Sequence, residues 1–407
     1  MAILTDIPAP APRTPPHILT LVALVGTSTL AMNVFLPSLP SMAAFFDTDY
    51  ATMQLSVGLF LVVNALLQLV VGPMSDRYGR RPVILGGIAL FLLATVGCLL
   101  APTAAIFLAF RMGQAAIVTA MVLSRAVVRD LYPQDRAASM LGYVTMGMSV
   151  VPMIGPAIGG VLEGAFGWKA NFVLLLVAGA ALWLWTWRDL GETHPPTGGS
   201  LRAQVAEYPE LLTSPRFWGY CLASAFASGA FFAYLGGAPF VGSVVYGMDP
   251  ATLGLFFGAP AVGYLVGNGI SGRFSAQLGI DRMILYGASG QLAGLSMLLL
   301  LTGFGFTSHW VFFGFMTFVG LGNGLVIPNA TAGMLSVRPH LAGTASGLGG
   351  AIMIGGGAAL SALAGLLLEL GGGALPLIAL MVASGLAGLA ATLLTLRRNR
   401  RLAAATP

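Results

Sequence analysis

Residues 72–81 read GPMSDRYGRR and lie between two long apolar runs. This stretch contains four ionic side chains: Asp76, Arg77, Arg80 and Arg81. The apolar runs cover residues 52–73 and 82–101. Each run provides the roughly 20 apolar residues that a helix needs to cross the roughly 30 Å hydrocarbon core of a bilayer. A charged connection between two such runs predicts two membrane-spanning helices that meet at a membrane surface.

The composition of the whole chain agrees with a membrane setting. Of its 407 residues, 57% are hydrophobic and 8% are charged, whereas a soluble chain has about 25% charged residues. The net charge of +5 comes from basic residues placed between apolar runs, so no basic patch for nucleic acid is expected. Cys98 and Cys221 lie inside apolar runs, which argues against a disulfide framework or a cysteine metal site. Residues 1–16 are rich in proline and do not resemble a cleavable signal peptide.

Twelve apolar runs predict an all-α membrane protein with twelve transmembrane helices. Their approximate limits are residues 18–38, 52–73, 82–101, 104–125, 138–162, 170–188, 217–240, 251–272, 283–303, 309–331, 341–368 and 374–396. The division between the third and fourth runs depends on the turn-forming sequence APTAA at 101–105.

Positive charge is distributed unevenly between the connections. Seventeen of the nineteen Lys and Arg residues fall on one side of a twelve-span chain. The exceptions are Lys169, which follows the fifth run, and Arg111, which lies inside the fourth. Because cytoplasmic connections are enriched in Lys and Arg, we expect a multi-pass membrane protein with both termini in the cytoplasm.

The longest hydrophilic stretch divides the twelve runs into two sets of six. Weak internal similarity crosses this stretch, since Glu163 and Glu369 end the fifth and eleventh runs, 206 residues apart (369 minus 163). We therefore expect two pseudo-symmetric six-helix bundles, an arrangement that places a substrate site between the repeats near the membrane midplane. The expected parts are an N-terminal cytoplasmic tail (1–16), an N-terminal bundle (17–188), a cytoplasmic linker (189–216), a C-terminal bundle (217–396) and a basic cytoplasmic tail (397–407).

Three stretches resemble motifs of the major facilitator superfamily. The charged stretch is similar to the signature between its second and third spans, with the matching residues Gly72, Asp76, Arg77, Gly79, Arg80 and Arg81. RMGQA in the fourth run, which contains Arg111 and Gln114, also agrees. VPMIGPAIGG in the fifth run resembles the superfamily's exporter Gly-Pro motif, with Gly155, Pro156, Gly159 and Gly160, although Val151 stands where a leading glycine is usual.

Within the superfamily, the chain looks most like the bicyclomycin and chloramphenicol/florfenicol resistance group of drug exporters. The resemblance lies in NVFLPSLPSM in the first run, in the signature stretch, and in VVRDLY at 127–132. It implies export of small amphipathic drugs across the bacterial inner membrane by alternating access, in exchange for protons. It also implies a monomer in the lipid bilayer that needs no cofactor and no metal ion.

The signature stretch is the expected conformational latch. A carboxylate at the end of a span can hold one conformation by charge-assisted hydrogen bonds to neighbouring arginines and release it when the halves tilt. We expect Asp76 to act in this way, surrounded by Arg77, Arg80, Arg81 and either Arg129 or Asp130. Gly72 and Gly79 would permit a close helix approach and a tight turn. The alternative is that Arg80 and Arg81 only fix the topology.

Arg111 is the charged residue that lies deepest in an apolar run. A guanidinium inside the hydrocarbon core is costly unless it faces a partner or a wet cavity, so we expect a functional role. The alternative is that its side chain extends to the membrane interface. The resemblance implies a part in substrate binding or proton movement.

The proton carrier is the open question. The drug-resistance group usually has an Asp four residues before the proline of the first span, but here that position, four before Pro37, is Asn33. No Asp or Glu lies near the centre of any run. Three hypotheses remain: Asp76 or Asp130 carries the proton, the charge of the drug drives the exchange, or the protein is an uncoupled facilitator.

The resemblance implies a cavity lined by spans one, four, seven and ten. It nominates Asn33, Phe35, Arg111, Gln114, Phe231, Tyr234 and Asn323 as substrate-binding or coupling residues. The aromatic sequence GAFFAYLGG in the seventh run suits an apolar pocket for planar drugs. For each of these residues, helix packing is the alternative role.

Other functional classes fit the sequence poorly. A nucleotide-driven pump needs a phosphate-binding loop with a lysine, and the sole lysine is Lys169 in FGWKANF. The four histidines lie in termini and loops, so we expect no intramembrane enzyme. The serious alternative to a drug exporter is a metabolite facilitator or importer of the same fold.

Overall fold

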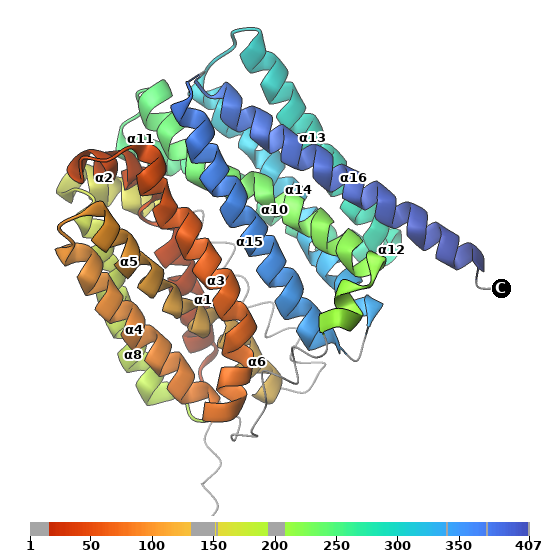
Figure 1. The fold of residues 1–407 in the computed structure, drawn as a ribbon, viewed down its shortest axis with the longest axis horizontal. Coiled ribbons are helices and arrows are strands. Elements are labelled where there is room, and N and C mark those ends of the chain that lie inside the picture. Colours follow the sequence, from red (N-terminus) through yellow and green to blue (C-terminus); the bar gives the residue numbers. More distant parts are fainter. Residues whose placement is uncertain are drawn as a thin grey trace, which may run out of the picture.

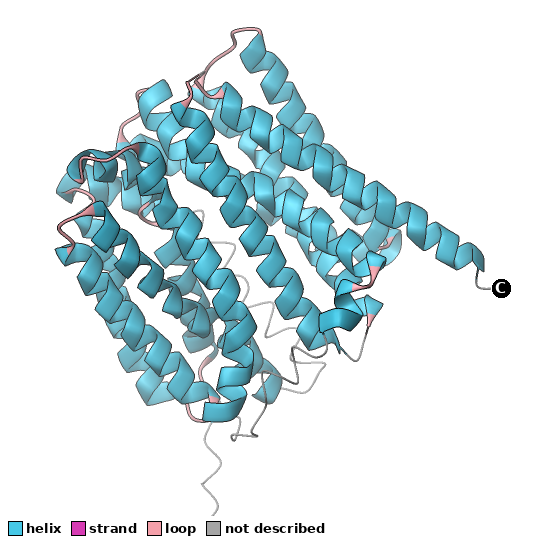
Figure 2. Ribbon diagram, in the orientation of Figure 1, coloured by secondary structure: helices cyan, strands magenta, loops and turns pink. Residues whose placement is uncertain are grey.

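The computed structural model describes residues 16–131, 151, 154–193, 208–338, 341–371 and 373–405. Nearly all of these residues are helical, and this part of the chain contains no strand (Figure 2). The first half contains α1 (Ile18–Asn33), the 3₁₀ turn η1 (Leu36–Ser38), α2 (Leu39–Phe45), α3 (Tyr50–Tyr78), α4 (Arg80–Leu100), α5 (Ala104–Gln114), the 3₁₀ turn η2 (Ala115–Ile117), α6 (Val118–Leu131), an apolar helix Ile154–Phe166 and α8 (Lys169–Asp189). The second half contains α10 (Pro215–Phe240), the π-helical turn η3 (Val241–Val245), α11 (Pro250–Phe257), α12 (Ala259–Leu278), α13 (Ile280–Gly303), α14 (His309–Val337), α15 (Ala342–Glu369) and α16 (Leu375–Ala405).

Eleven helical segments in the described ranges are long and apolar enough to cross a membrane. The shorter apolar helix Ile154–Phe166 supplies a twelfth candidate, and the start of the expected run 138–162 lies outside the described residues. Three spans are built from two helices each, because a local break interrupts the helix without ending the span. The breaks fall at η1 beside Pro37, at η2, and at Gly258 between α11 and α12. The predicted all-α, two-bundle membrane fold is confirmed.

The two halves repeat the same local features 200 residues apart. Asp49 caps the N-terminus of α3, and Asp249 caps α11 at the corresponding place (249 minus 49). Gly79 and Gly279 (279 minus 79) both join two long helices with a positive φ, of 94° and 83°. These angles are accessible to glycine without strain. Glycine therefore allows each half to reverse direction between its second and third spans in a single residue.

The two halves lie side by side along α3 and α15 (Figure 1). Hydrogen bonds join them at the end of the molecule opposite to the start of α1 and the end of α16. There the Tyr50 hydroxyl donates to the Gly236 carbonyl oxygen (2.7 Å), and the Ala51 N–H donates to Oε1 of Glu369 (2.8 Å). Deeper along the same pair of helices, the Gln54 amide donates to the Ser361 carbonyl oxygen. The structure is therefore closed between the halves at this end.

Two predicted connections are helical instead. Helix α3 continues to Tyr78, so most of the signature stretch is helix and only Gly79 lies between α3 and α4. Helix α16 continues to Ala405, so the expected basic tail from residue 397 is mostly a helical extension of the last span. A fall in hydropathy marks where a helix is expected to leave the membrane, not where its backbone hydrogen bonds end. Residues 194–207 of the expected linker lie outside the described ranges.

Candidate functional site

Arg111 lies in α5 with 1% of its surface exposed. Its guanidinium donates three hydrogen bonds to three different elements. Nε donates to the Ser56 carbonyl oxygen (3.3 Å), Nη1 to Oε1 of Gln114 (2.6 Å), and Nη2 to the Ala31 carbonyl oxygen (2.9 Å). All of these partners lie inside the N-terminal half, and the side chain is enclosed by protein. Arg111 links α1, α3 and α5 through acceptors that carry no formal charge.

Two aromatic rings lie against the guanidinium of Arg111. Its central carbon is 4.3 Å from the ring centroid of Phe35 and 4.2 Å from that of Phe60. The described part of the chain pairs it with no carboxylate. A cation over an aromatic face gains about 2 kcal/mol when the site is desolvated. Ring faces and neutral oxygens therefore offset the cost of burying this charge, in place of a counter-ion.

Gln114 extends this buried polar group to α4. Its side chain is fully buried, and Nε2 donates to the Thr95 hydroxyl (2.8 Å). Sequence analysis found Arg111 and Gln114 but missed Ser56, Phe60 and Thr95. Ser56 and Phe60 are spaced to lie one turn apart on one face of a helix, a pattern that groups these two residues but gives no sign of Thr95.

Asn33 lies near this group but is not bonded to Arg111. Its Nδ2 donates to the Thr29 carbonyl oxygen of its own helix (3.0 Å), and its Oδ1 has no hydrogen-bond partner among the described residues. Its Cβ faces Gly155, where an added methyl group would come within 3.8 Å. The structure thus places Asn33 at the contact between α1 and the helix Ile154–Phe166.

The nominated residues of the C-terminal half form a separate group. Tyr234 is fully buried in α10, and its hydroxyl donates to the Phe257 carbonyl oxygen (2.9 Å). Phe231, half-buried one turn earlier, stacks 6.4 Å from the Tyr234 ring. Asn323 is buried in α14, and its Oδ1 has no partner among the described residues. In this conformation Tyr234 is part of the core, so a role in binding substrate stays a prediction.

At the signature stretch, an ion pair between described residues joins α4 to α6. Arg80 Nε lies 3.1 Å from Oδ2 of Asp130, and Nη1 of the same arginine donates to the Ser75 hydroxyl. Arg77 is exposed and lies over the ring of its neighbour Tyr78. The side chains of Asp76 and Arg129 lie outside the described part of the structure. Of the expected latch partners, the structure therefore brings together Arg80 and Asp130.

The two signature glycines differ in their surroundings. Gly79 has the positive φ of a tight turn, as expected. Among the described residues, a Cβ at Gly72 would meet no heavy atom within 4 Å, so the close helix approach at this glycine stays a prediction. The fifth-span motif provides such an approach.

The residues of the Gly-Pro motif all lie on the helix Ile154–Phe166: Gly155, Pro156, Gly159 and Gly160. A Cβ on Gly159 would overlap the Val34 carbonyl oxygen of the first span. A Cβ on Gly160 would overlap the Pro250 carbonyl oxygen at the start of α11. The motif therefore lets one helix touch the backbone of its own half and that of the other half.

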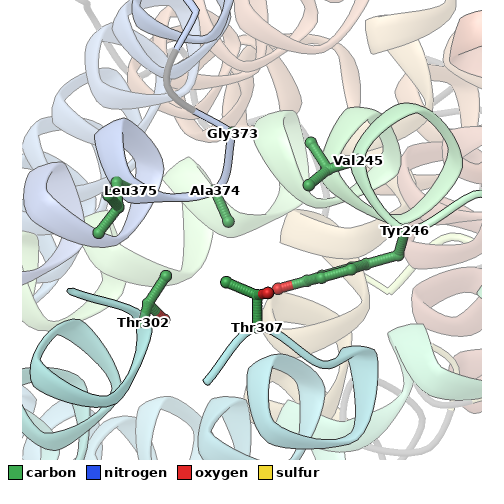
Figure 3. A pocket seen from close by; sticks show the side chains of 7 residues that line it. All are labelled: Val245, Tyr246, Thr302, Thr307, Gly373, Ala374 and Leu375. Atoms are coloured by element: carbon green, nitrogen blue, oxygen red, sulfur yellow. The ribbon is translucent and has the colours of Figure 1, made fainter. Parts of the chain in front are cut away.

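Two hollows in the described part of the chain are lined by none of the nominated residues. One, of about 340 Å³, opens between η3, the α13–α14 connection and the start of α16, and is lined by Val245, Tyr246, Thr302, Thr307, Gly373, Ala374 and Leu375. Figure 3 shows its Tyr246 ring lying across the hollow with the hydroxyl toward Thr307. Burial raises the pKa of this tyrosine. The other, of about 390 Å³, is lined by Arg216, Tyr220, Ile280, Asp281, Ser336, Asn399 and Leu402. Within the described ranges, no cluster of His, Cys, Asp or Glu could hold a metal ion.

Comparison with known proteins connects this geometry to a family. The sequence profile of the Major Facilitator Superfamily matches residues 21–362. The chain belongs to the Major Facilitator Superfamily. As a member of that superfamily, it is a small-molecule transporter of the lipid bilayer and not an enzyme.

Among relatives within the superfamily are two bacterial resistance proteins. The chain is 30% identical to a chloramphenicol resistance protein of Pseudomonas aeruginosa over 335 residues, which is 80% of this chain and 79% of the relative. It is 29% identical to multidrug resistance protein D of Escherichia coli (strain K12) over 366 residues, or 89% and 91% of the two chains. The crystal structure of a bacterial homologue of the human lysosomal transporter Spinster shares the fold, with a TM-score of 0.73, 18% identity and coverage of 94% and 96%. The two resistance proteins support a drug efflux transporter, and the Spinster homologue supports the fold.

Proposed function

We propose that this protein exports small amphipathic drugs such as chloramphenicol, florfenicol or bicyclomycin by alternating access, in exchange for protons. The observation that carries the proposal is the resistance function named for relatives that align over most of their length. We further propose that the protein works as a monomer in the bacterial inner membrane, with both termini in the cytoplasm.

The contacts between the halves support alternating access. Hydrogen bonds from Tyr50, Ala51 and Gln54 close the end opposite to the chain termini. With cytoplasmic termini, this would be the outer end. Alternating access requires these hydrogen bonds to break when one half rocks against the other. The nominated residues in both halves would then become accessible in another conformation.

A second function is favoured by the surroundings of Arg111. Its guanidinium is satisfied by carbonyl oxygens, an amide and two rings, and Asn33 cannot exchange a proton. Asp130 is engaged with Arg80. A facilitator of the same fold, which moves a metabolite or a drug down its gradient, would need no proton carrier in this half.

Proton flux measured with added drug separates the two functions. Inside-out vesicles are given an acidic interior that quenches a pH-sensitive dye, and chloramphenicol, florfenicol and a cationic dye are added in turn. Recovery of fluorescence with one compound, lost in Arg111→Ala and kept in Arg400→Ala on the exposed end of α16, would support proton antiport. No recovery, with uptake of a labelled compound down its gradient, would contradict antiport and support the facilitator.

A further inference from the structure

Glu192 lies just after α8, at the start of the connection between the two halves. Its carboxylate accepts hydrogen bonds from the first two N–H groups of α4. Oε1 accepts from the backbone of Arg80 (2.8 Å), and Oε2 accepts from the backbone of Arg81 (3.2 Å). The first N–H groups of a helix have no partner inside the helix and favour a negative charge. A residue 112 positions later in the chain therefore caps the helix that begins in the signature stretch.

Gly79 makes room for this carboxylate. Gly79 precedes α4 and has no side chain to cap it, and the first turn of α4 contains no acidic residue. A Cβ on Gly79 would lie 2.9 Å from Cδ of Glu192. The signature glycine thus serves two purposes, since it permits the positive φ and leaves space for Glu192.

The corresponding helix start in the second half, at Gly279, has different surroundings. Gly279 makes the equivalent turn, but a Cβ there would meet no heavy atom within 4 Å. The helix that follows, α13, carries its own acidic residue, Asp281, in its first turn. The cap by Glu192 is therefore specific to the half that contains the signature stretch, and is not a general feature of the repeat.

Two further contacts fix the same connection to the N-terminal half. The Thr193 hydroxyl donates to Oδ2 of Asp130 (3.4 Å), the oxygen that also pairs with Arg80. Nη2 of Arg81 donates to the Trp187 carbonyl oxygen in the last turns of α8 (2.7 Å). The ends of α3, α6 and α8, the start of α4 and the start of the connection therefore meet in one cluster.

We propose that Glu192 is a positioning residue for transport, which anchors the start of the connection between the halves to the signature stretch. The connection to the C-terminal half then begins at a fixed point on the N-terminal half. The signature stretch and the start of this connection therefore move together. The inference rests on the proposed transport function. Glu192 itself binds no substrate, so its removal should slow the conformational cycle and leave substrate affinity unchanged.

The test compares Glu192→Ala and Glu192→Gln with Glu210→Gln in the full-length protein. Glu210 is a matched control because it lies near the other end of the same connection, in an exposed ion pair with Arg338. Hydrogen–deuterium exchange of the Arg80 and Arg81 amides, which donate to Glu192, reports the cap directly. Initial rates of labelled chloramphenicol uptake into inside-out vesicles give Vmax and KM.

We expect exchange of the Arg80 and Arg81 amides to be about tenfold faster in Glu192→Ala, with a smaller change in Glu192→Gln, which keeps one acceptor oxygen. Vmax should fall about threefold or more in Glu192→Ala while KM stays the same, and Glu210→Gln should match the wild type. Exchange and Vmax in Glu192→Ala equal to those of Glu210→Gln would overturn the proposal, as would a parallel change in KM. If the wild type moves no compound, the proposed function fails, and the exchange data alone then decide whether Glu192 anchors the connection.

Discussion

The guanidinium carbon of Arg111 lies 4.2 Å from the ring centroid of Phe60, one helix away. Phe60→Leu keeps an apolar side chain but removes the ring face, so it should lower the stability by about 2 kcal/mol. The expected result is a lower melting temperature of the purified protein in detergent. Phe304→Leu provides the control, because Phe304 is 80% exposed. Equal melting temperatures for the two variants would show that the ring face does not stabilise the buried charge.

Arg111→Lys should be nearly as harmful as Arg111→Met. Lysine keeps the charge but lacks the planar fork, so one ammonium group cannot reach the Ala31 and Ser56 carbonyl oxygens and Gln114 together. Each buried acceptor left without a donor costs about 1–3 kcal/mol. Melting temperature and the rate of drug uptake would be measured for both variants. Wild-type behaviour of Arg111→Lys would mean that charge alone is required.

Gly159→Ala should disrupt the contact between the helix Ile154–Phe166 and the first span. The added methyl group would overlap the Val34 carbonyl oxygen, which belongs to a backbone that cannot turn aside. Overpacking of this kind costs about 1–3 kcal/mol. Gly164→Ala is the matched control on the same helix, because a Cβ there meets no heavy atom within 4 Å. Yield of folded protein and melting temperature should fall for Gly159→Ala but not for Gly164→Ala.

Arg80 and Asp130 should be energetically coupled. Their side chains are only 10% and 16% exposed, so the ion pair is screened less than a surface pair. A double-mutant cycle with Arg80→Gln and Asp130→Asn should give a coupling energy of about 1–3 kcal/mol. Thermal unfolding of the two single variants and the double variant measures it. Additive effects of the two changes would contradict a latch that depends on this pair.

Asp49 should make the stability of α3 depend on pH. Hydrogen bonds from the Thr52 backbone, and then from its hydroxyl, hold the pKa of Asp49 below its usual value. Since the pKa is lower in the folded protein, the stabilisation is present above the unfolded pKa of about 3.9 and is lost as pH falls through the folded pKa. Asp49 is exposed to solvent, so the effect should be only a few tenths of a kcal/mol.

Melting curves between pH 5 and about pH 3 would test this dependence. The wild type should lose stability more steeply than Asp49→Asn over this range. Asp47→Asn is the control, because Asp47 precedes the cap and begins no helix. A wild-type curve parallel to that of Asp49→Asn would exclude the capping contribution.

The sequence predicted the spans well and their ends less well. Long apolar runs are sufficient to specify helices in a membrane, because backbone N–H and C=O groups must be paired inside the bilayer. Hydropathy did not indicate that α3 continues to Tyr78 or that α16 continues to Ala405. A charged stretch outside the membrane can be either a helix or a loop, so a fall in hydropathy does not distinguish the two. The break of the first span beside Pro37 was not predicted either.

The sequence by itself determined that this is a two-bundle membrane transporter, because hydropathy, charge asymmetry and the signature stretch are local patterns. It also identified Arg111 as unusual, because a charge in an apolar run needs no structure to be noticed. Only the tertiary structure decided how that charge is held. Phe60 and the carbonyl oxygens of Ala31 and Ser56 come from other helices, and carbonyl oxygens are present at every residue. The ring and these oxygens contact Arg111 only because the helices pack together, and no pattern in the sequence predicts that packing.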